Sequence, residues 1–218
     1  MTDDALRLSQ ELRDRLAADF QPVRPLRSPW MRTLVVVPVA VIALFAASIT
    51  FNVRSDAERL GWIGVWGLSV LQFAIGLGVV AAALRESVPG RGWSRAAIAA
   101  WLAIPLGAMI AITLFSWETS QVMVRRQWWL VAGLCFSGSA ATALPVVALS
   151  AILAARAYPT RPAIAGALFG AGSGLIADAG WRVFCHFGEP AHVLSAHLAA
   201  VVMSAAIGSL LSMRLARA

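Results

Sequence analysis

Six apolar segments constrain the fold of this chain more than any other feature of its sequence. Each is close to the length of about 20 residues that a helix needs to cross the hydrocarbon core of a bilayer. The segments cover approximately residues 33–51, 60–84, 96–117, 128–155, 163–181 and 193–213. Charged residues make up only 13% of the chain, against about 25% in a soluble domain. We therefore predict an all-α, polytopic membrane protein, with a six-helix transmembrane bundle over residues 33–218 and a separate polar tail over residues 1–32.

The distribution of arginine predicts the side of the membrane on which each connector lies. Short polar connectors make neighbouring spans antiparallel, so six spans place both termini on one side. Thirteen of the 18 basic residues, all of them arginine, lie in the N-terminal tail, the second and fourth connectors and the C-terminus. Basic residues accumulate in cytoplasmic segments, so we expect both termini in the cytoplasm and the connector around residue 188 outside. Because arginine without lysine is typical of GC-rich bacterial genomes, we expect a multi-pass protein of the bacterial inner membrane.

Two broad classes of function are not supported by the sequence. The formal net charge of +7 is also found in nucleic-acid-binding proteins, but no compact basic patch with interleaved aromatic residues occurs. Cytoplasmic arginines of a membrane protein account for the same charge. The sequence contains no zinc-protease, phosphate-loop, nucleophile-elbow or EF-hand motif. We therefore expect neither direct nucleic-acid binding nor an enzyme.

The fifth apolar segment contains glycines at a regular helical spacing. Gly166, Gly170 and Gly174 are four residues apart in "GALFGAGSG", which places them on one face of a helix. Small residues at this spacing let two helices approach closely in lipid. We expect this stripe to pack against another helix of the bundle.

Few ionisable groups fall within the apolar segments. Asp178 lies near the outer end of segment five, four residues before Arg182, and this spacing allows an ion pair on one helical face. His197 lies about one turn into segment six, where a hydrogen bond to another helix is the common role of histidine. A small transporter or channel using Asp178 and His197 is an alternative function, although a conduction pathway normally needs polar groups at several depths.

The segment "FCHFGEPAHVLSAH", residues 184–197, gathers most of the chain's reactive side chains. It holds Cys185, all three histidines and Glu189. The other cysteine, Cys135, lies seven residues after Trp128, or roughly 10 Å along segment four from its outer end. Both thiols are therefore predicted on the outer side, where oxidants and soft metal ions reach them. Cys135, Cys185, His186 and His192 are candidate metal ligands, although paired C-x-x-C spacing is absent; two unrelated buried cysteines and a solvated connector are the alternative.

The polar tail contains an amphipathic pattern. Leu8, Leu12 and Leu16 recur every four residues in "DDALRLSQELRDRLAADF", which predicts a helix with one apolar face. Three prolines in "QPVRPLRSPW" then form a stiff, extended connector to the membrane. The helix either lies on a solvated or membrane surface or enters a groove on a cytoplasmic partner.

The tail and the two cysteines resemble one known family. "LAADFQPVRPLRSPW", followed by six apolar segments with Cys135 at the start of the fourth and Cys185 after the fifth, is similar to the NrsF-type membrane anti-sigma factors of proteobacteria. The resemblance extends over the whole chain. The matching positions of its most specific block are Leu16, Asp19, Pro22, Val23, Arg24 and Leu26. Pro25 stands where the family often has a second basic residue.

The resemblance implies a function. The cytoplasmic tail would hold an extracytoplasmic-function sigma factor away from RNA polymerase, and Cys135 and Cys185 would sense heavy-metal or oxidative stress. The residues assigned to sigma-factor binding are Leu8, Leu12, Leu16, Asp19, Pro22, Val23, Arg24, Leu26 and Arg27. No resident cofactor is expected, only transient binding of a soft metal. A membrane scaffold without a sensing role is a further alternative.

Overall fold

The computed structural model describes residues 10–19, 25–50, 53–116 and 128–217, and every regular element within them is helical. The elements are α1 (Gln10–Asp19), α2 (Pro29–Thr50), α3 (Ala57–Trp62), η2 (Ile63–Gly67), α4 (Leu68–Glu86), α5 (Arg95–Ser116), α6 (Trp128–Ala155), α7 (Pro162–Trp181), α8 (Pro190–His192), η4 (Val193–Leu198) and α9 (Ala199–Leu215). The two η elements are π-helical turns that continue into α4 and α9. The prediction of an all-α fold is confirmed for the described residues.

Each predicted apolar segment corresponds to a helix. Five helices are long and apolar enough to cross a membrane: Ala57–Glu86, Arg95–Phe115, Trp128–Ala155, Pro162–Trp181 and Pro190–Leu215. Over its described apolar part, Pro29–Phe45, α2 is shorter. Five candidate spans are therefore present among the described residues, and a sixth crossing by α2 stays a prediction.

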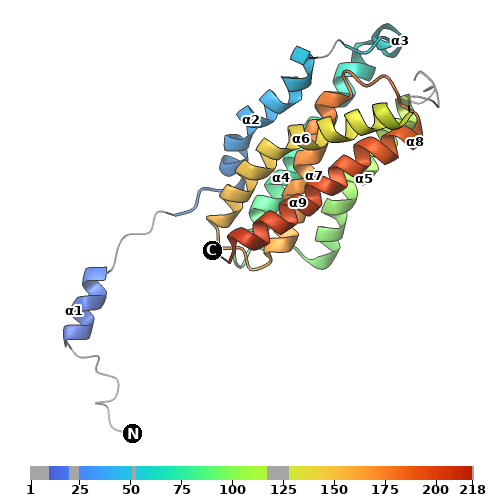
Figure 1. Ribbon diagram of the computed structural model, residues 1–218. Coiled ribbons are helices and arrows are strands. Elements are labelled where there is room, and N and C mark those ends of the chain that lie inside the picture. Colours follow the sequence, from blue (N-terminus) through green and yellow to red (C-terminus); the bar gives the residue numbers. More distant parts are fainter. Residues whose placement is uncertain (1–9, 20–24, 51–52, 117–127, 218) are drawn as a thin grey trace.

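Neighbouring helices run in opposite directions, as the short connectors predicted (Figure 1). We call the end of the bundle that holds the start of α2 and the end of α9 the terminal end, and the opposite end the distal end. At the terminal end, the buried guanidinium of Arg32 on α2 donates hydrogen bonds to the carbonyl oxygens of Leu84 on α4, at 3.1 Å, and of Leu153 on α6. Glu86 and Arg161 form an ion pair of 2.6 Å at the same end. The tail and the C-terminus thus join the bundle at one end.

α7 lies at the centre of the bundle and is buried continuously from Leu168 to Trp181. The predicted glycine stripe packs against α9. A Cβ atom on Gly174 would lie 2.8 Å from the Cα of Val201, and a Cβ atom on Gly166 or Gly170 would lie even closer to backbone atoms of α9. On another face of α7, Gly172 meets Gly76 of α4. The prediction that this stripe packs against a neighbouring helix is confirmed.

The tail contains the predicted helix, α1, which lies apart from the bundle (Figure 1). Leu12 and Leu16 are 42% and 52% exposed, and Asp19 is exposed as well. Leu26 and Arg27, in the connector to α2, are also exposed. The other residues assigned to sigma-factor binding lie outside the described residues: Leu8, Pro22, Val23 and Arg24.

Candidate thiol and metal site

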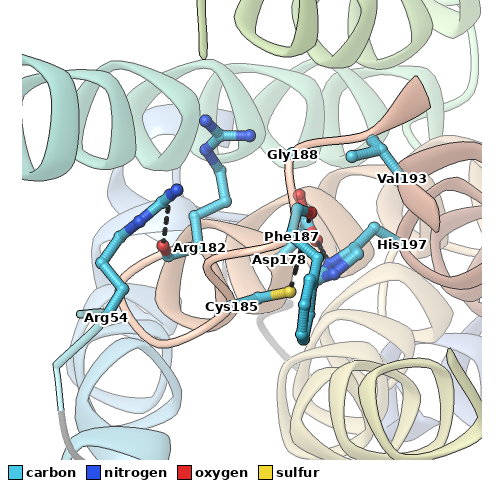
Figure 2. A pocket seen from close by; sticks show the side chains of 8 residues that line it. All are labelled: Arg54, Asp178, Arg182, Cys185, Phe187, Gly188, Val193 and His197. Carbon is cyan, nitrogen blue, oxygen red and sulfur yellow. Dashed lines mark hydrogen bonds and ion pairs between the residues drawn. The ribbon is translucent and has the colours of Figure 1, made fainter. Parts of the chain in front are cut away.

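The site lies at the distal end, in the loop of residues 182–189 between α7 and α8. The connector after α2 fixes the start of this loop. The buried side chain of Arg54 forms an ion pair of 2.5 Å with Asp56 and donates a hydrogen bond of 3.3 Å to the carbonyl oxygen of Arg182 (Figure 2). The backbone N–H of Arg54 donates a further bond of 2.9 Å to the carbonyl oxygen of Val183. Two connectors far apart in the sequence are thus joined directly beside Cys185.

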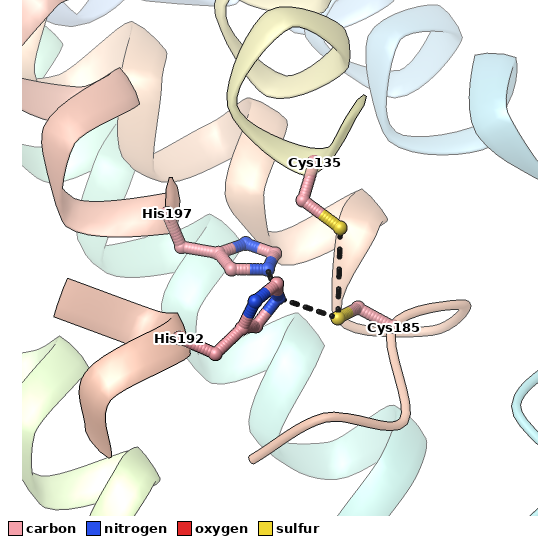
Figure 3. Close-up of side chains that lie close together, drawn as sticks. All are labelled: Cys135, Cys185, His192 and His197. Atoms are coloured by element: carbon pink, nitrogen blue, oxygen red, sulfur yellow. Dashed lines mark hydrogen bonds between the residues drawn. The ribbon is translucent and has the colours of Figure 1, made fainter. Parts of the chain in front are cut away.

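The two cysteines lie together as free thiols. Cys135 is buried on α6, Cys185 is partly buried in the loop, and their Sγ atoms are 3.8 Å apart (Figure 3). Trp128 and Phe136 of α6 and Ala196 of η4 pack around them. The fold therefore brings together two thiols that are 50 residues apart in the sequence.

Two of the three histidines complete a cluster with these thiols. The Nε2 atom of His192 is 3.2 Å from the Sγ of Cys185 and 3.2 Å from the Nε2 of His197 (Figure 3). One ligand atom from each of Cys135, Cys185, His192 and His197 lies within 4.8 Å of every other. His186 lies outside this group and contacts the ring of Phe187, with centroids 4.2 Å apart. The structure thus brings together three of the four candidate ligands and adds His197.

A π-helical turn explains why His192 and His197 face each other. In a regular α-helix, residues five apart differ by about 140° around the axis. The stretch Val193–Leu198 is η4 instead, with hydrogen bonds between residues five apart. This wider turn brings the two rings to one side, with centroids 5.1 Å apart. Single π-helical turns within α-helices are frequent at functional sites.

Asp178 holds His197 from the side opposite the thiols. One carboxylate oxygen of this buried aspartate lies 2.5 Å from the Nδ1 of His197, and the other accepts a hydrogen bond of 2.6 Å from the side-chain amide of Gln72 on α4. The ion pair with Arg182 that the sequence spacing allows is not formed. His197 and Gln72 take both carboxylate oxygens, and Figure 2 shows the guanidinium of Arg182 directed away from Asp178.

Comparison with known proteins identifies the family. The sequence profile of NrsF, described as negative regulator of sigma F, matches residues 16–217. The chain belongs to the NrsF family. No curated protein and no solved structure matches it. Membership implies that this chain is a negative regulator of a sigma factor and that a sigma factor is its partner.

The surroundings of Cys185 in this NrsF chain favour its thiolate. Cys185 lies in the loop outside the candidate spans. The hydrogen bond from the Cys135 thiol holds the pKa of Cys185 well below its ordinary value, and the nearby imidazoles of His197 and His192 act in the same direction. Burial raises the pKa of this thiol but does not outweigh those contacts. A thiolate is the form that binds soft metals and attacks oxidants.

Two cavities of the NrsF chain border Cys185. A small cavity of about 10 Å³, also bordered by Asp178 and His197, has room for about one water-sized sphere. A larger, apolar groove of about 620 Å³ reaches both thiols from the side of Trp181 and Phe184. Small reagents thus have a route to the sulfur atoms.

The predicted hydrogen bond from His197 to another helix is confirmed by its contact with Asp178 of α7. The sequence patterns predict neither the position of His197 beside the thiols nor the role of Gln72. The signal for Gln72 is its amide within the apolar run "LSVLQFAIGL". The signal for His197 is its distance of five residues from His192, which points to one site only if the helix widens there.

Proposed function

We propose that this chain is a membrane-bound anti-sigma factor that holds an extracytoplasmic-function sigma factor with its tail and releases it when heavy-metal ions or oxidants act on Cys135 and Cys185. The main support for this proposal is the pair of free thiols at the distal end, whose Sγ atoms are 3.8 Å apart. Membership of the NrsF family implies that the partner is a sigma factor. The tail, with residues 1–32 on the cytoplasmic side of the inner membrane, is the part that reaches this partner.

The chemistry at the thiols follows from their separation. A soft metal ion displaces the proton of the Cys135 thiol and binds both sulfur atoms. An oxidant instead accepts two electrons while the Cys135 thiol loses its proton and forms a disulfide with the Cys185 thiolate. A disulfide shortens the Sγ separation from 3.8 Å to about 2.0 Å and so draws α6 toward the loop after α7, whereas a bridging metal ion fixes these two elements to each other.

A continuous path connects the thiols with the tail. α6 carries Cys135 near the distal end and Leu153 at the terminal end, where the carbonyl oxygen of Leu153 accepts a hydrogen bond from Arg32. Arg32 is in the first turns of α2, directly after the connector to the tail. A rotation or shift of α6 therefore displaces the anchor of the tail.

Replacing the cysteines tests the sensor. Cys135→Ser and Cys185→Ser should each abolish induction of a sigma-dependent reporter by cadmium or peroxide, and the double variant should be no worse than either single variant, because the thiols act as a pair. Ala132→Ser is the matched control, since it adds a hydroxyl to the same buried cluster and leaves both thiols in place. A normal response from the double cysteine variant would reject the sensor.

Binding by the tail rests on the exposed leucines of α1. We propose that Leu8, Leu12 and Leu16 enter an apolar groove of the sigma factor, that Arg24 and Arg27 pair with its acidic side chains, and that Asp19, Pro22, Val23 and Leu26 shape the same contact. Leu12 and Leu16 present large apolar surfaces on α1. A few such anchors supply most of the energy of a helix in a groove, about 2 kcal/mol or more each.

A charge on the apolar face of α1 tests this contact. Leu12→Asp should release the sigma factor and raise the reporter signal without stress, because a carboxylate cannot enter an apolar groove without losing hydration. Ala17→Asp adds the same charge about 140° around the helix at another exposed position, and should keep repression. Co-purification of the sigma factor with the membrane-inserted variants provides the measurement. Full repression by Leu12→Asp would exclude α1 from the interface.

A further inference from the structure

We infer that Cys135, Cys185, His192 and His197 form one tetrahedral Cys₂His₂ site for a divalent ion of the zinc type, Zn²⁺ or Cd²⁺, with Asp178 as the positioning residue that orients His197. The inference rests on the proposed function, because it uses the same two thiols. It goes beyond that function by assigning two nitrogen ligands, the class of ion and a buried carboxylate behind the site.

The separations of the ligand atoms match a tetrahedral ion. With metal–sulfur bonds of about 2.3 Å and metal–nitrogen bonds of about 2.0–2.1 Å, a tetrahedral zinc ion separates its sulfurs by about 3.8 Å and its nitrogens by about 3.4 Å. The two Sγ atoms are 3.8 Å apart and the two Nε2 atoms 3.2 Å apart. Sulfur–nitrogen separations of about 3.6 Å are required, and all four atoms already lie within 4.8 Å of one another. Side-chain shifts of about 1 Å therefore complete the site.

Asp178 fixes the form of His197 that binds a metal. A carboxylate oxygen 2.5 Å from Nδ1 accepts a hydrogen bond from the N–H of that nitrogen, so the lone pair on Nε2 faces the cluster. Gln72 donates to the other carboxylate oxygen and holds it in place. Metal-binding histidines commonly donate their second ring N–H to a carboxylate in this way. For His192, Nδ1 has no hydrogen-bond partner among the described residues, so Asp178 makes His197 the better oriented of the two histidines.

The charge of the loaded site suits its burial. Cys135, His192 and His197 are buried, and an unpaired ion there would be costly. Two thiolates balance a divalent cation, and two neutral imidazoles add no charge. The ligands come from α6, the loop of residues 182–189, α8 and η4, so one ion joins all of them.

Cobalt provides a direct test, because tetrahedral Co²⁺ bound to thiolates has intense visible absorption. The full-length protein in detergent micelles, with its thiols reduced, should bind one Co²⁺ with these bands, and Zn²⁺ or Cd²⁺ should displace it. His192→Ala and His197→Ala should lose the tetrahedral spectrum. Asp178→Asn should keep the bands but weaken binding by about 10–100-fold. His186→Ala, a histidine of the same loop outside the cluster, should bind as the wild type does.

The outcomes separate this inference from the proposed function. Wild-type cobalt spectra and affinities in His192→Ala and His197→Ala would overturn the four-ligand site, while loss of metal induction in the cysteine variants would still support the thiol sensor. Equal weakening by His186→Ala and His192→Ala would also overturn it. His197→Gln, which has similar volume and no imidazole, replaces His197→Ala if the alanine variant fails to purify as a monodisperse protein that retains the sigma factor. Normal metal induction in the double cysteine variant would reject both proposals.

Discussion

Cys185 differs from an ordinary cysteine because three nearby groups favour its thiolate: the Cys135 thiol and the imidazoles of His192 and His197. The Cys135 thiol lies 3.8 Å from its Sγ and the Nε2 of His192 lies 3.2 Å away. Its position in the loop leaves it partly exposed beside a groove of about 620 Å³. This residue therefore combines access with a reactive protonation state, whereas Cys135 is buried.

The lowered pKa of Cys185 predicts the pH dependence of its alkylation. A pKa below the ordinary value near 8.5 means that the thiolate fraction, and hence the rate with iodoacetamide, should already be near its maximum at pH 8 and fall only at lower pH. Cys135→Ala removes the largest cause of the lowering, so it should move the midpoint of the rate profile upward. Mass spectrometry of the labelled peptide gives the rate at each pH. A midpoint at or above that of a free thiol in the wild type would contradict the prediction.

At the scale of the helices, close packing of α7 and α9 depends on glycine. Gly170 faces the backbone of Ser204 and Ala205 with no space for a methyl group. Gly170→Ala should therefore separate the two helices and destabilise the protein by about 1–3 kcal/mol. Gly133→Ala on α6 is the matched control, because a Cβ atom there meets nothing within 4 Å. Thermal unfolding in detergent compares the two variants, and equal melting temperatures would show that the stripe does not set the distance between the helices.

The helices could be predicted from the sequence because their signal is local. Runs of apolar residues set the bounds of the candidate span Ala57–Glu86 and of α5, α6 and α7 to within a few residues, and the spacing of Gly166, Gly170 and Gly174 correctly predicted a helix contact. The π-helical turn η4 could not be predicted in this way. It depends on the packing of the last helix against α6 and α7, and only this turn brings His197 to His192.

The partners of Asp178 show the same limit. Sequence spacing pointed to Arg182 on the same helix, whereas the carboxylate is bound by Gln72 from α4 and His197 from η4. Both partners are more than 15 residues away in the sequence, so no local pattern connects them to Asp178. The arrangement of the helices in the bundle decides which groups surround a buried charge. This arrangement cannot be read directly from a single sequence.

For the whole molecule, the central prediction is the orientation in the membrane. The start of α2 and the end of α9 lie at one end of the bundle, and the loop between α7 and α8, which contains Cys185, lies at the other (Figure 1). The arginine distribution assigns the terminal end to the cytoplasm. Reporter fusions should therefore place residues 1 and 218 in the cytoplasm and a fusion at residue 188 in the periplasm. A periplasmic C-terminus would contradict this orientation and remove the thiols from the oxidising side.

The central position of α7 also has a consequence for how the protein is made. α7 is the least apolar and the most buried of the five candidate spans, and near its outer end it contains Asp178, whose ionised carboxyl group is costly to bury in a membrane span without partners. The two side chains that bind this carboxylate are synthesised at different times, because Gln72 precedes α7 and His197 follows it. We therefore expect α7 to enter the membrane during translation with one carboxylate oxygen still unpaired. Stable integration of this span should then wait until the last 30 or so residues of the chain are synthesised and α9 covers the glycine face.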